Sequence, residues 1–298
     1  MAAEFEKAAI IGLGLIGGSL AAACKKYGGA GEIFGYDLDR KTVELARNKD
    51  LAERCYCTAG GKYPGIEEVD LVILAVPVKK IPGVLENISG YISSDTIITD
   101  TGSTKNYIMN RSIEIISGTD GVHFIGGHPL AGSEKSGLEH RDADLFKGAK
   151  YVLVMPDSEH DVISQVKKLK GFLTNFGSKV IGMKPKEHDR IIASISHLPQ
   201  IAATILSACT GGRDDELSYL KMASSGFSDT TRLALSSPDI WCDILLTNKK
   251  YVLEILRAYQ GEIDKFVDAL ENEDRAALRN MFQEGARVRE KFEEVREE

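Results

Sequence analysis

The sequence predicts an α/β protein of two domains, in which a doubly wound parallel sheet precedes an all-α C-terminal domain. From Lys7 to about Met183, short apolar runs alternate with stretches of helical period, whereas only long helix-period segments follow Lys184-Pro185. At 298 residues the chain also exceeds the usual size of a single domain. We therefore expect a sheet domain at residues 1–183 and a helical domain at residues 184–298.

Seven runs are rich in β-branched and other apolar residues, as buried parallel strands are. They are AAIIG (8–12), EIFGYD (32–37), DLVILAV (70–76), TIITD (96–100), VHFIGG (122–127), YVLVM (151–155) and KVIGM (179–183). The Val76-Pro77 step closes the third run, because proline donates no hydrogen bond to a strand ladder. We expect the helix-period stretches between these runs to cover both faces of the sheet.

The first run leads into a glycine-rich turn, Gly12-Leu-Gly14-Leu-Ile-Gly17, with the spacing G-x-G-x-x-G. Gly12 permits a tight turn, Gly14 lets a pyrophosphate approach the backbone, and Gly17 lets the following helix pack closely. The first amides of that helix then face the negative charge. We predict a Rossmann-type dinucleotide-binding loop, and the other candidate contacts of this loop region are Leu15, Ile16, Val76 and Pro77.

Asp37 ends the second expected strand, twenty residues after Gly17. A carboxylate at this position accepts hydrogen bonds from the adenosine ribose hydroxyls and repels the 2′-phosphate of NADP. Arg40 follows three residues later and is a further cofactor-binding candidate that moderates this repulsion. The motif therefore predicts NAD as the cofactor.

Long helix-period segments run from about residue 186 to 209 and from residue 238 to the C-terminus. Pro199 lies inside the first segment and removes the hydrogen bond to the Ile195 carbonyl, so we expect a kink near His197. A helical domain of this size has more apolar positions than it readily buries alone. They include Trp241, Leu245, Leu246, Val252, Leu253, Leu256 and Phe266. We therefore expect a homodimer formed through these helices.

The charge balance argues against a nucleic-acid partner. The chain has 37 Lys and Arg residues against 44 Asp and Glu residues, for a net charge of -7. A small anionic substrate must therefore be held by particular positive side chains rather than by the overall field.

The cysteines and the apolar runs are typical of a cytoplasmic protein. Five cysteines without a regular framework indicate a reducing compartment. Cys55 and Cys57 have no second ligand pair at metal spacing, so we interpret them as strand residues and expect no metal. Glu4 and Glu6 precede the apolar stretch 8–24, where a signal peptide has basic residues. We find no other run near the ~20 residues of a membrane span and expect no membrane partner.

Polar segments follow two of the expected strands, at the edge where open parallel sheets bind ligands. TIITD leads into TGSTK (101–105), and VHFIGG leads into HPLAGSEKSG (128–137). A histidine on the loop that leaves a strand, followed by proline and small residues, is typical of ligand contact rather than core packing. We expect both segments to lie at the nicotinamide end of the cofactor.

The motifs D-x-G-S-x-K, G-G-H-P-x-A-G-x-E-x-S-G and S-H-L-P occur in this order along the chain. With these motifs the chain resembles the prephenate and arogenate dehydrogenase family over nearly its whole length. The resemblance continues through His188-Asp189-Arg190 and Thr231-Arg232. It implies NAD-dependent oxidative decarboxylation of prephenate to 4-hydroxyphenylpyruvate, a step of tyrosine and hence aromatic amino acid biosynthesis.

The resemblance also implies roles for individual residues. His128 is implied as the base that accepts the hydroxyl proton, Ser103 as the residue that orients the hydroxyl or His128, and Arg232 as the clamp for a substrate carboxylate. The other implied substrate-binding residues are His197, Ser133, Glu134 and Gly226. We interpret His188 and His123 as structural, whereas Lys105 and Arg190 either hold anions, cap a helix or pair with carboxylates.

Three other functions remain open. The segment 224–228 departs from the family pattern, so an arogenate (cyclohexadienyl) dehydrogenase is the first alternative. A β-hydroxyacid dehydrogenase has the same domain order, but it has a catalytic lysine in the second domain, where the first helix of this chain has Arg190 and His197. A non-catalytic NAD-sensing module is the alternative of another class, against which His128, Ser103 and Arg232 argue together.

Overall fold

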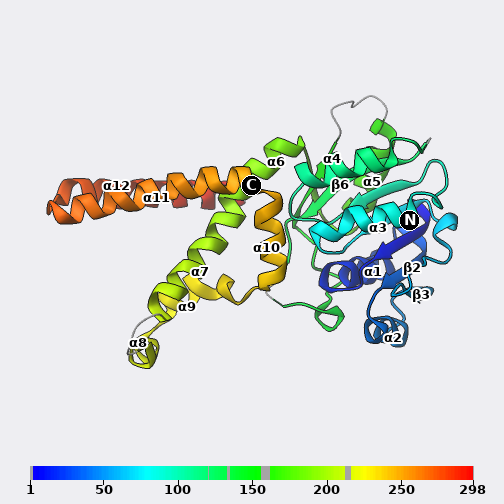
Figure 1. Cartoon of the computed structure of the whole chain (residues 1–298), viewed down its shortest axis with the longest axis horizontal. Helices are drawn as coiled ribbons and strands as arrows, with labels where there is room; N and C mark the ends of the chain where they lie inside the picture. The colour runs from blue at the N-terminus through cyan, green and yellow to red at the C-terminus, as the bar shows by residue number, and fades with distance from the viewer. Residues whose placement is uncertain (1–2, 120, 133–134, 156–161, 212–215, 298) are drawn as a thin grey trace. The chain divides into compact units, whose positions relative to one another are not determined.

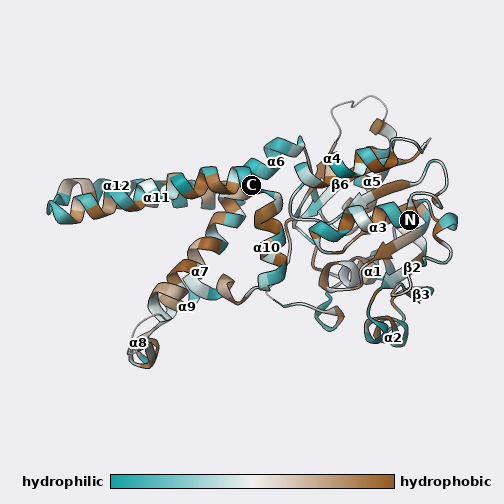
Figure 2. Ribbon diagram, in the orientation of Figure 1, coloured by the Kyte–Doolittle hydropathy of each residue, from teal (hydrophilic) through white to brown (hydrophobic). Residues whose placement is uncertain are grey.

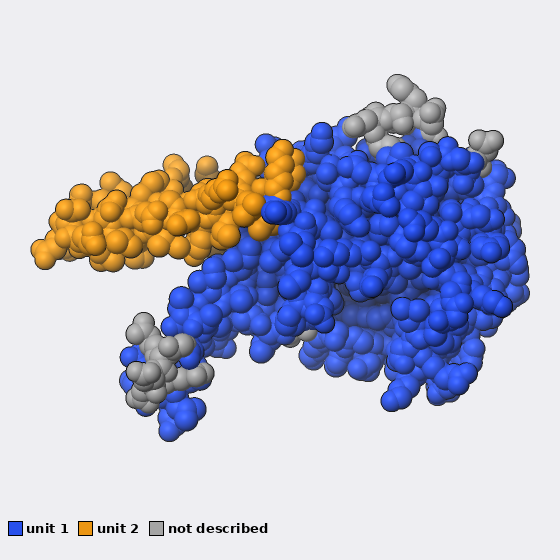
Figure 3. Space-filling view, viewed as in Figure 1, with its two compact units in different colours: residues 1–249 blue, residues 250–298 orange. Residues whose placement is uncertain are grey.

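The computed structural model describes residues 3–119, 121–132, 135–155, 162–211 and 216–297 (Figure 1). The chain forms two compact units, residues 1–249 and 250–298, which Figure 3 draws in blue and orange. The sheet lies in the first unit and its last strand ends at Met183. A division into domains between residues 183 and 184 stays a prediction.

The first unit contains one eight-stranded sheet with the strand order β3-β2-β1-β4-β5-β6-β7-β8. The strands are β1 (Phe5–Ile11), β2 (Ala30–Asp37), β3 (Arg54–Cys57), β4 (Leu71–Leu74), β5 (Ile97–Asp100), β6 (His123–Pro129), β7 (Lys150–Val154) and β8 (Lys179–Met183). All seven expected runs form strands. The additional strand, β3, contains Cys55 and Cys57, which confirms them as strand residues. The order reverses between β1 and β4, where open α/β sheets bind ligands.

Helices cover both faces of the sheet. Because successive residues of a strand point to opposite faces, each strand contributes side chains to two hydrophobic cores. In β1, Ala8 and Ile10 belong to one hydrophobic core and Ala9 and Ile11 to the other. The first core contains residues of α1 (Leu15–Tyr27), α2 (Arg40–Asn48) and α5 (Ile163–Asn175). The second contains residues of α3 (Ile81–Ile88) and α4 (Asn106–Ile116). This arrangement confirms the doubly wound α/β fold.

Strands β7 and β8 run opposite to the first six strands. β6 and β7 pair antiparallel, with Gly126 opposite Val154, and β8 is parallel to β7. The expectation of a wholly parallel sheet is therefore wrong for these two strands. The connection explains the reversal, because the described part of residues 130–149 contains one short 3₁₀ helix, η3 (Leu138–His140). Parallel neighbours would need a longer crossover, usually an α-helix.

After the sheet the chain continues as an irregular helical run. The π-helical segment η5 (Ala193–His197) joins α6 (Pro185–Ile192) to α7 (Leu198–Gly211). The distortion expected near His197 is this π-helical segment, which directly precedes Leu198-Pro199. Four further elements complete the first unit: α8 (Glu216–Met222), α9 (Ser225–Thr231), η6 (Arg232–Leu235) and α10 (Pro238–Thr247).

Residues 185–211 form the one helical run among the described residues that is long and apolar enough to cross a membrane. The expectation that no run besides residues 8–24 approaches this length is therefore wrong. The indication of a membrane span rests on the length and composition of the helix alone. The run also carries the buried polar side chains of His188, Asp189 and His197, which hydrogen-bond to other parts of the first unit. Buried polar side chains that hydrogen-bond to the rest of the protein, as those of His188 and Asp189 do, are typical of a helix packed within a protein.

The second unit contains most of α11 (Lys249–Glu271) and all of α12 (Arg275–Glu297). The rings of Phe266 and Phe282 join the two helices in an edge-to-face contact with centroids 5.9 Å apart. Figure 2 shows hydrophilic and hydrophobic residues interspersed along both helices. The exposed apolar residues on one face of α11 are Leu253, Ile263, Val267 and Leu270.

Candidate active site

The glycine loop lies between β1 and α1, where the strand order reverses. Gly12 has a φ of +95°, and a Cβ at this position would collide with the Ala75 carbonyl oxygen at the end of β4. A Cβ on Gly17 would collide with the Gly12 carbonyl oxygen, whereas the Cβ position of Gly14 is open. The three glycines thus give a tight turn, a closely packed helix and an accessible backbone edge, as the motif predicts.

The N-terminus of α1 is the anion-binding feature of this loop. Gly14 is its N-cap and provides no side-chain hydrogen bond, so the first backbone N–H groups are left for a ligand. Leu15 and Ile16 form the first turn of the helix. Val76 and Pro77 follow β4, and the Cγ1 of Val76 approaches the Cβ position of Gly12. The predicted cofactor contacts of this region are therefore neighbours in space.

Asp37 at the end of β2 binds the glycine loop itself. Its Oδ2 accepts a hydrogen bond from Leu13 N at 2.7 Å, and its Oδ1 accepts one from Asp39 N at 2.9 Å. A carboxylate oxygen can accept two hydrogen bonds, so both oxygens keep capacity for a ribose hydroxyl. Arg40 is the exposed first residue of α2, and the side chain of Asp39 caps this helix.

A buried ion pair joins the ends of β5 and β6. Lys105 Nζ contacts Asp100 Oδ2 and donates to the Gly127 carbonyl at 2.6 Å. Asp100 also accepts from Gly102 N at 2.8 Å and from Gly127 N at 3.0 Å. Burial lowers the pKa of Lys105, and the charge of Asp100 opposes this shift. The pair therefore fixes the turn that carries the half-buried Ser103 against the end of β6.

His128 lies near the end of β6 and is 8% exposed. Its Nδ1 lies 2.8 Å from Nε2 of His188 on α6, and His188 Nδ1 lies 2.8 Å from Asp189 Oδ1. The Asp189 carboxylate also accepts from the backbone nitrogens of Lys105 at 2.7 Å and Asn106 at 2.9 Å. The same carboxylate therefore binds the ring of His188 and fastens α6 to the turn after β5.

His197 in the π-helical segment belongs to the same polar network. Asn248 Nδ2 donates to the Asp189 carbonyl at 2.8 Å and lies 3.3 Å from His197 Nδ1. The carbonyl identifies the amide nitrogen of Asn248 as the donor, so His197 Nδ1 accepts and His197 Nε2 carries the hydrogen. This Nε2 is buried without a partner among the described residues. A buried donor without an acceptor costs about 1–3 kcal/mol, which favours a ligand oxygen at this position.

Burial lowers the pKa of all three histidines. The pKa of His128 lies well below its usual 6.5, chiefly because the ring is desolvated, and the neighbouring His188, Lys105 and His197 add to the shift. Burial also lowers the pKa of His188, although Asp189 opposes this, and it lowers the pKa of His197 to about 4. The three rings are therefore neutral at pH 7, the form in which an imidazole nitrogen accepts a proton.

Two of the expected substrate-binding residues lie on other elements of the first unit. Gly226 belongs to α9 and Arg232 begins η6, and both residues are exposed. These two elements pack against α7. Ser133 and Glu134 lie outside the described residues. The structure thus brings His128 and His197 into one network, whereas Gly226 and Arg232 lie on elements that pack against α7.

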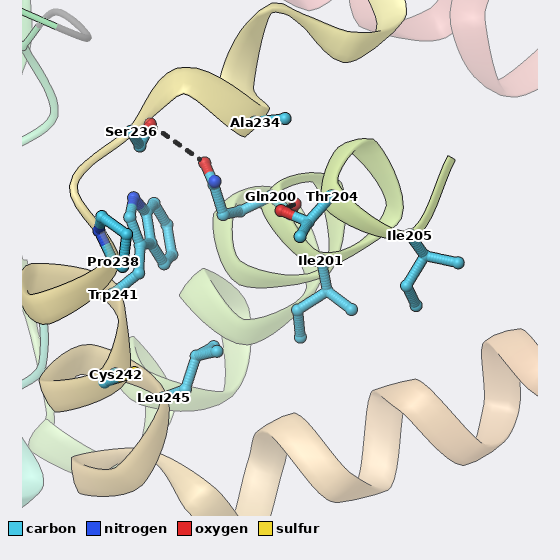
Figure 4. Close-up of a pocket in the computed structure, with 10 residues that line it drawn as sticks. All are labelled: Gln200, Ile201, Thr204, Ile205, Ala234, Ser236, Pro238, Trp241, Cys242 and Leu245. Carbon is cyan, nitrogen blue, oxygen red and sulfur yellow. Dashed lines mark hydrogen bonds between the residues drawn. The ribbon is translucent and has the colours of Figure 1, made fainter. Parts of the chain in front are cut away.

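A cavity of about 330 Å³ lies among α7, η6 and α10 (Figure 4). Its lining residues are Gln200, Ile201, Thr204, Ile205, Ala234, Ser236, Pro238, Trp241, Cys242 and Leu245. Ser236 Oγ donates to Gln200 Oε1 at 3.4 Å, the dashed line in Figure 4. The ring of Trp241 also packs edge-to-face against His197, with centroids 5.8 Å apart. Trp241 therefore links the cavity wall to the polar network.

Two family models match the chain. Residues 20–182 match "Prephenate dehydrogenase, nucleotide-binding domain", and residues 184–284 match "Prephenate dehydrogenase, dimerization domain". The chain belongs to the prephenate dehydrogenase family. This membership confirms the family that the sequence motifs indicate and makes the chain an oxidoreductase with a nucleotide-binding domain.

Individual relatives agree with this assignment. The prephenate dehydrogenase of Lactococcus lactis subsp. cremoris is 35% identical, over 97% of this chain and 78% of the relative. The cyclohexadienyl dehydrogenase of Zymomonas mobilis subsp. mobilis is 30% identical, over 96% of this chain and 95% of the relative. The crystal structure of prephenate dehydrogenase from A. aeolicus, in complex with hydroxyphenyl propionate and NAD+, has a TM-score of 0.87 and 29% identity, and the match covers 96% and 98% of the two chains.

Three polar residues of this member of the prephenate dehydrogenase family were not expected at the site. His188 is interpreted from sequence as structural, and no role is predicted for Asp189 or Asn248, yet all three connect His128 with His197. The adjacent His-Asp pair at the start of a proline-capped helix is the signal in the sequence. Among the described residues, no group of His, Cys, Asp and Glu side chains could hold a metal ion.

Proposed function

We propose that this chain is an NAD-dependent prephenate dehydrogenase of tyrosine biosynthesis, which converts prephenate to 4-hydroxyphenylpyruvate and carbon dioxide. The main support is His128, a neutral and nearly buried histidine at the end of β6, next to the fixed turn after β5. The proposed reaction is the one for which the family is named. The hydroxyphenyl propionate of the A. aeolicus complex shares a hydroxyphenyl ring with the proposed product.

NAD is the cofactor in this proposal, and the glycine loop fits it. The open backbone edge at Gly14 and the uncapped N-terminus of α1 accommodate a pyrophosphate, and Asp37 keeps capacity for ribose hydroxyls. The proposed cofactor-binding residues are Gly12, Gly14, Leu15, Ile16, Gly17, Asp37, Arg40, Val76 and Pro77. When bound, NAD accepts the hydride that leaves the ring carbon bearing the hydroxyl.

His128 acts as the base in the proposed reaction. Its neutral ring takes up the proton of the ring hydroxyl, which helps the carbon–oxygen bond become a carbonyl. Loss of the ring carboxylate as carbon dioxide then makes the ring aromatic, and the phenolate oxygen regains the proton. Ser103, on the turn held by the Asp100–Lys105 pair, orients the hydroxyl or His128 in this proposal.

Cationic and donor groups hold the substrate. We assign the clamp for a carboxylate to Arg232, because a guanidinium fork matches a planar carboxylate. His197 is assigned a substrate oxygen as the acceptor for its buried Nε2–H. The remaining proposed substrate-binding residues are Ser133, Glu134 and Gly226.

Arogenate is the alternative substrate, because it differs from prephenate only in carrying an amino group where prephenate has a keto group. The Z. mobilis relative is named a cyclohexadienyl dehydrogenase, so substrates of this kind vary among relatives. The segment 224–228, which departs from the family pattern, contains Gly226 on α9. The relative kcat/KM for prephenate and arogenate therefore has to be measured.

The protein acts as a cytoplasmic homodimer in this proposal, with a small-molecule substrate and without nucleic acid or membrane partners. Residues 184–284 match the family's dimerization domain. The exposed apolar face of α11 supports such a contact, since Leu253, Ile263 and Val267 share it.

Formation of NADH tests the function most simply. The purified chain is mixed with NAD and either prephenate or arogenate, and absorbance at the NADH band is followed. We expect steady turnover with prephenate at a higher kcat/KM than with arogenate. A higher value for arogenate would change the substrate assignment, and no turnover with either compound would favour the NAD-sensing module.

A further inference from the structure

The proton positions in the chain from Asp189 to His128 follow from the hydrogen bonds themselves. The Asp189 carboxylate accepts hydrogen bonds from the backbone nitrogens of Lys105 and Asn106. It also lies 2.8 Å from His188 Nδ1. An ionised carboxylate only accepts, so His188 Nδ1 must carry a hydrogen. A bare nitrogen there would set two lone pairs against each other at hydrogen-bond distance.

The second nitrogen of His188 is then bare. His188 is fully buried, and desolvation keeps its ring neutral at pH 7. A neutral ring protonated at Nδ1 has a lone pair at Nε2, and this atom lies 2.8 Å from His128 Nδ1. His128 Nδ1 must therefore donate, which leaves His128 Nε2 bare.

We propose that His188 and Asp189 are positioning residues that set the tautomer of His128, with Nδ1 protonated and Nε2 free to accept the substrate proton. The catalytic consequence rests on the proposed function, whereas the tautomer is a property of the protein alone. After proton uptake, the Nδ1–H of the His128 imidazolium still donates to His188, so the same bond stabilises the charged ring.

The anchoring of Asp189 makes this setting rigid. Its carboxylate is held by two backbone amides of the turn after β5, and its own carbonyl accepts from Asn248. The ring of His188 meets that of His128 at 68°, with centroids 5.1 Å apart. Neither ring is therefore able to flip or exchange nitrogens without breaking a buried hydrogen bond.

Nitrogen NMR of the free protein tests the tautomer directly. The full chain is labelled with ¹⁵N-histidine, and protonated and bare ring nitrogens are distinguished by chemical shift at pH 7.5, with His128→Gln and His188→Gln used for assignment. We expect both rings to be neutral and protonated at Nδ1. A His128 ring protonated at Nε2 would overturn the proposal, whatever substrate the enzyme uses.

Paired variants of His188 test the catalytic consequence. In His188→Leu no acceptor remains for His128 Nδ1–H, so kcat should fall about 100- to 10,000-fold while KM for prephenate and NAD changes little. His188→Gln offers its amide oxygen to His128 and should retain kcat within about tenfold of wild type. His123→Leu and His123→Gln are the matched controls, because His123 is half-buried on the same strand and outside the network.

Asp189→Leu tests the origin of the proton order. Leucine offers no acceptor to His188 Nδ1–H, so His188 is no longer held with Nδ1 protonated and can donate from Nε2 to His128, which moves the His128 proton to Nε2. We expect a His128 ring no longer held with Nδ1 protonated and a kcat lowered about 100- to 10,000-fold, with a far-UV circular dichroism spectrum like that of wild type. An unchanged His128 tautomer in folded His188→Leu and Asp189→Leu, together with near-normal kcat, would overturn the proposal.

The two proposals fail differently. If the wild type does not oxidise prephenate but shows the expected His128 tautomer, the function is wrong and the positioning role stands. If the wild type oxidises prephenate and His188→Leu does so equally well, the function stands and the positioning role is wrong.

Discussion

Asp37 has two tasks that depend on one carboxylate. It accepts the Leu13 amide at 2.7 Å and so holds the glycine loop, and we propose that it also binds the adenosine ribose. In this proposal its negative charge repels the 2′-phosphate of NADP. The same side chain would then both shape the loop and select the cofactor.

Asp37→Ser should weaken discrimination between the two cofactors. Removal of the charge should lower the ratio of kcat/KM for NAD to that for NADP by about 10- to 100-fold, since like charges in contact cost several kcal/mol. NAD efficiency should also fall, because the Leu13 amide loses its strong acceptor. Steady-state kinetics with both cofactors measures this, and Asp39→Ser, which keeps a helix-capping side chain, is the control. An unchanged ratio would remove Asp37 from cofactor selection.

Arg232 is the residue proposed to hold a carboxylate in a chain whose net charge is -7. Arg232→Ala should mainly raise KM for prephenate and lower kcat/KM about 30- to 1000-fold, because a bidentate charged contact is lost. Arg232→Lys should recover only part of the lost kcat/KM, since an ammonium group lacks the two-pronged donor geometry of guanidinium. Initial rates over a range of prephenate concentrations measure this, with the exposed Arg279→Ala as control. A normal KM for Arg232→Ala would assign the carboxylate to another cation.

The residues that the sequence predicted best depend on local backbone geometry. Gly12, Gly14 and Gly17 could be assigned separate tasks from their spacing, and the structure shows the tight turn at Gly12, the close packing at Gly17 and open space at Gly14, whereas the cofactor contact stays a prediction. His188 could not be assigned, because its contact with His128 joins residues sixty positions apart and depends on how α6 docks. Side-chain pairing across elements leaves no periodic signal in one sequence.

At the scale of elements, α6 is the part of the helical run that bonds to the sheet. Pro185 begins the helix, and three and four positions later His188 and Asp189 bond to β6 and to the turn after β5, respectively. The seven apolar strands were predictable from their composition. The short β3 and the reversed β7 and β8 were not, because β3 is partly polar and strand direction depends on the connection that precedes it.

The apolar face of α11 should form the dimer contact. Ile263→Glu with Val267→Glu places two charges on that face and should raise the dimer dissociation constant about 100-fold or more, because unpaired charges are costly to bury. Light scattering after size exclusion, over a dilution series, measures the mass. Ala258→Glu is the matched control, since it lies five residues from Ile263 and on another side of the helix. Equal dissociation constants for both variants and the wild type would place the contact elsewhere.

At the scale of the whole molecule, folding of the first unit brings three neutral histidines into one buried network. His128 comes from the sheet, His188 from α6 and His197 from the π-helical segment. Asp189 and Asn248 connect them. Because each histidine has a lowered pKa when folded, the unfolded chain binds more protons in mild acid than the folded chain does.

The free energy of unfolding should therefore fall as the pH falls below 6.5. Unfolded histidines protonate near pH 6.5, whereas His197 stays neutral in the folded state down to about pH 4. Each such histidine contributes a slope of about 1.4 kcal/mol per pH unit within its window. Urea unfolding at pH 7.5, 6.5, 5.5 and 4.5 measures the slope.

The His197→Gln variant shows how much of that slope belongs to one ring. Between pH 6 and 4.5 its slope should be smaller than that of the wild type by about one proton, or about 1.4 kcal/mol per pH unit. Asn175→Gln, which changes no titratable group, is the control and should keep the wild-type slope. Equal slopes in wild type and His197→Gln would contradict a neutral buried His197.

The kcat of His128→Asn with prephenate and NAD tests the central claim most directly. Asparagine keeps polar side-chain groups of similar size but is not a base at neutral pH, so kcat should fall about 100- to 10,000-fold while KM and NAD affinity move much less. The wild-type rate should hold below pH 6.5 and decline only in stronger acid, because the pKa of His128 is lowered and only the neutral ring accepts the proton. That decline should be absent in the variant, and His123→Asn should behave as wild type. A folded His128→Asn enzyme that binds NAD and keeps a near-normal kcat would contradict the assignment of His128 as the base.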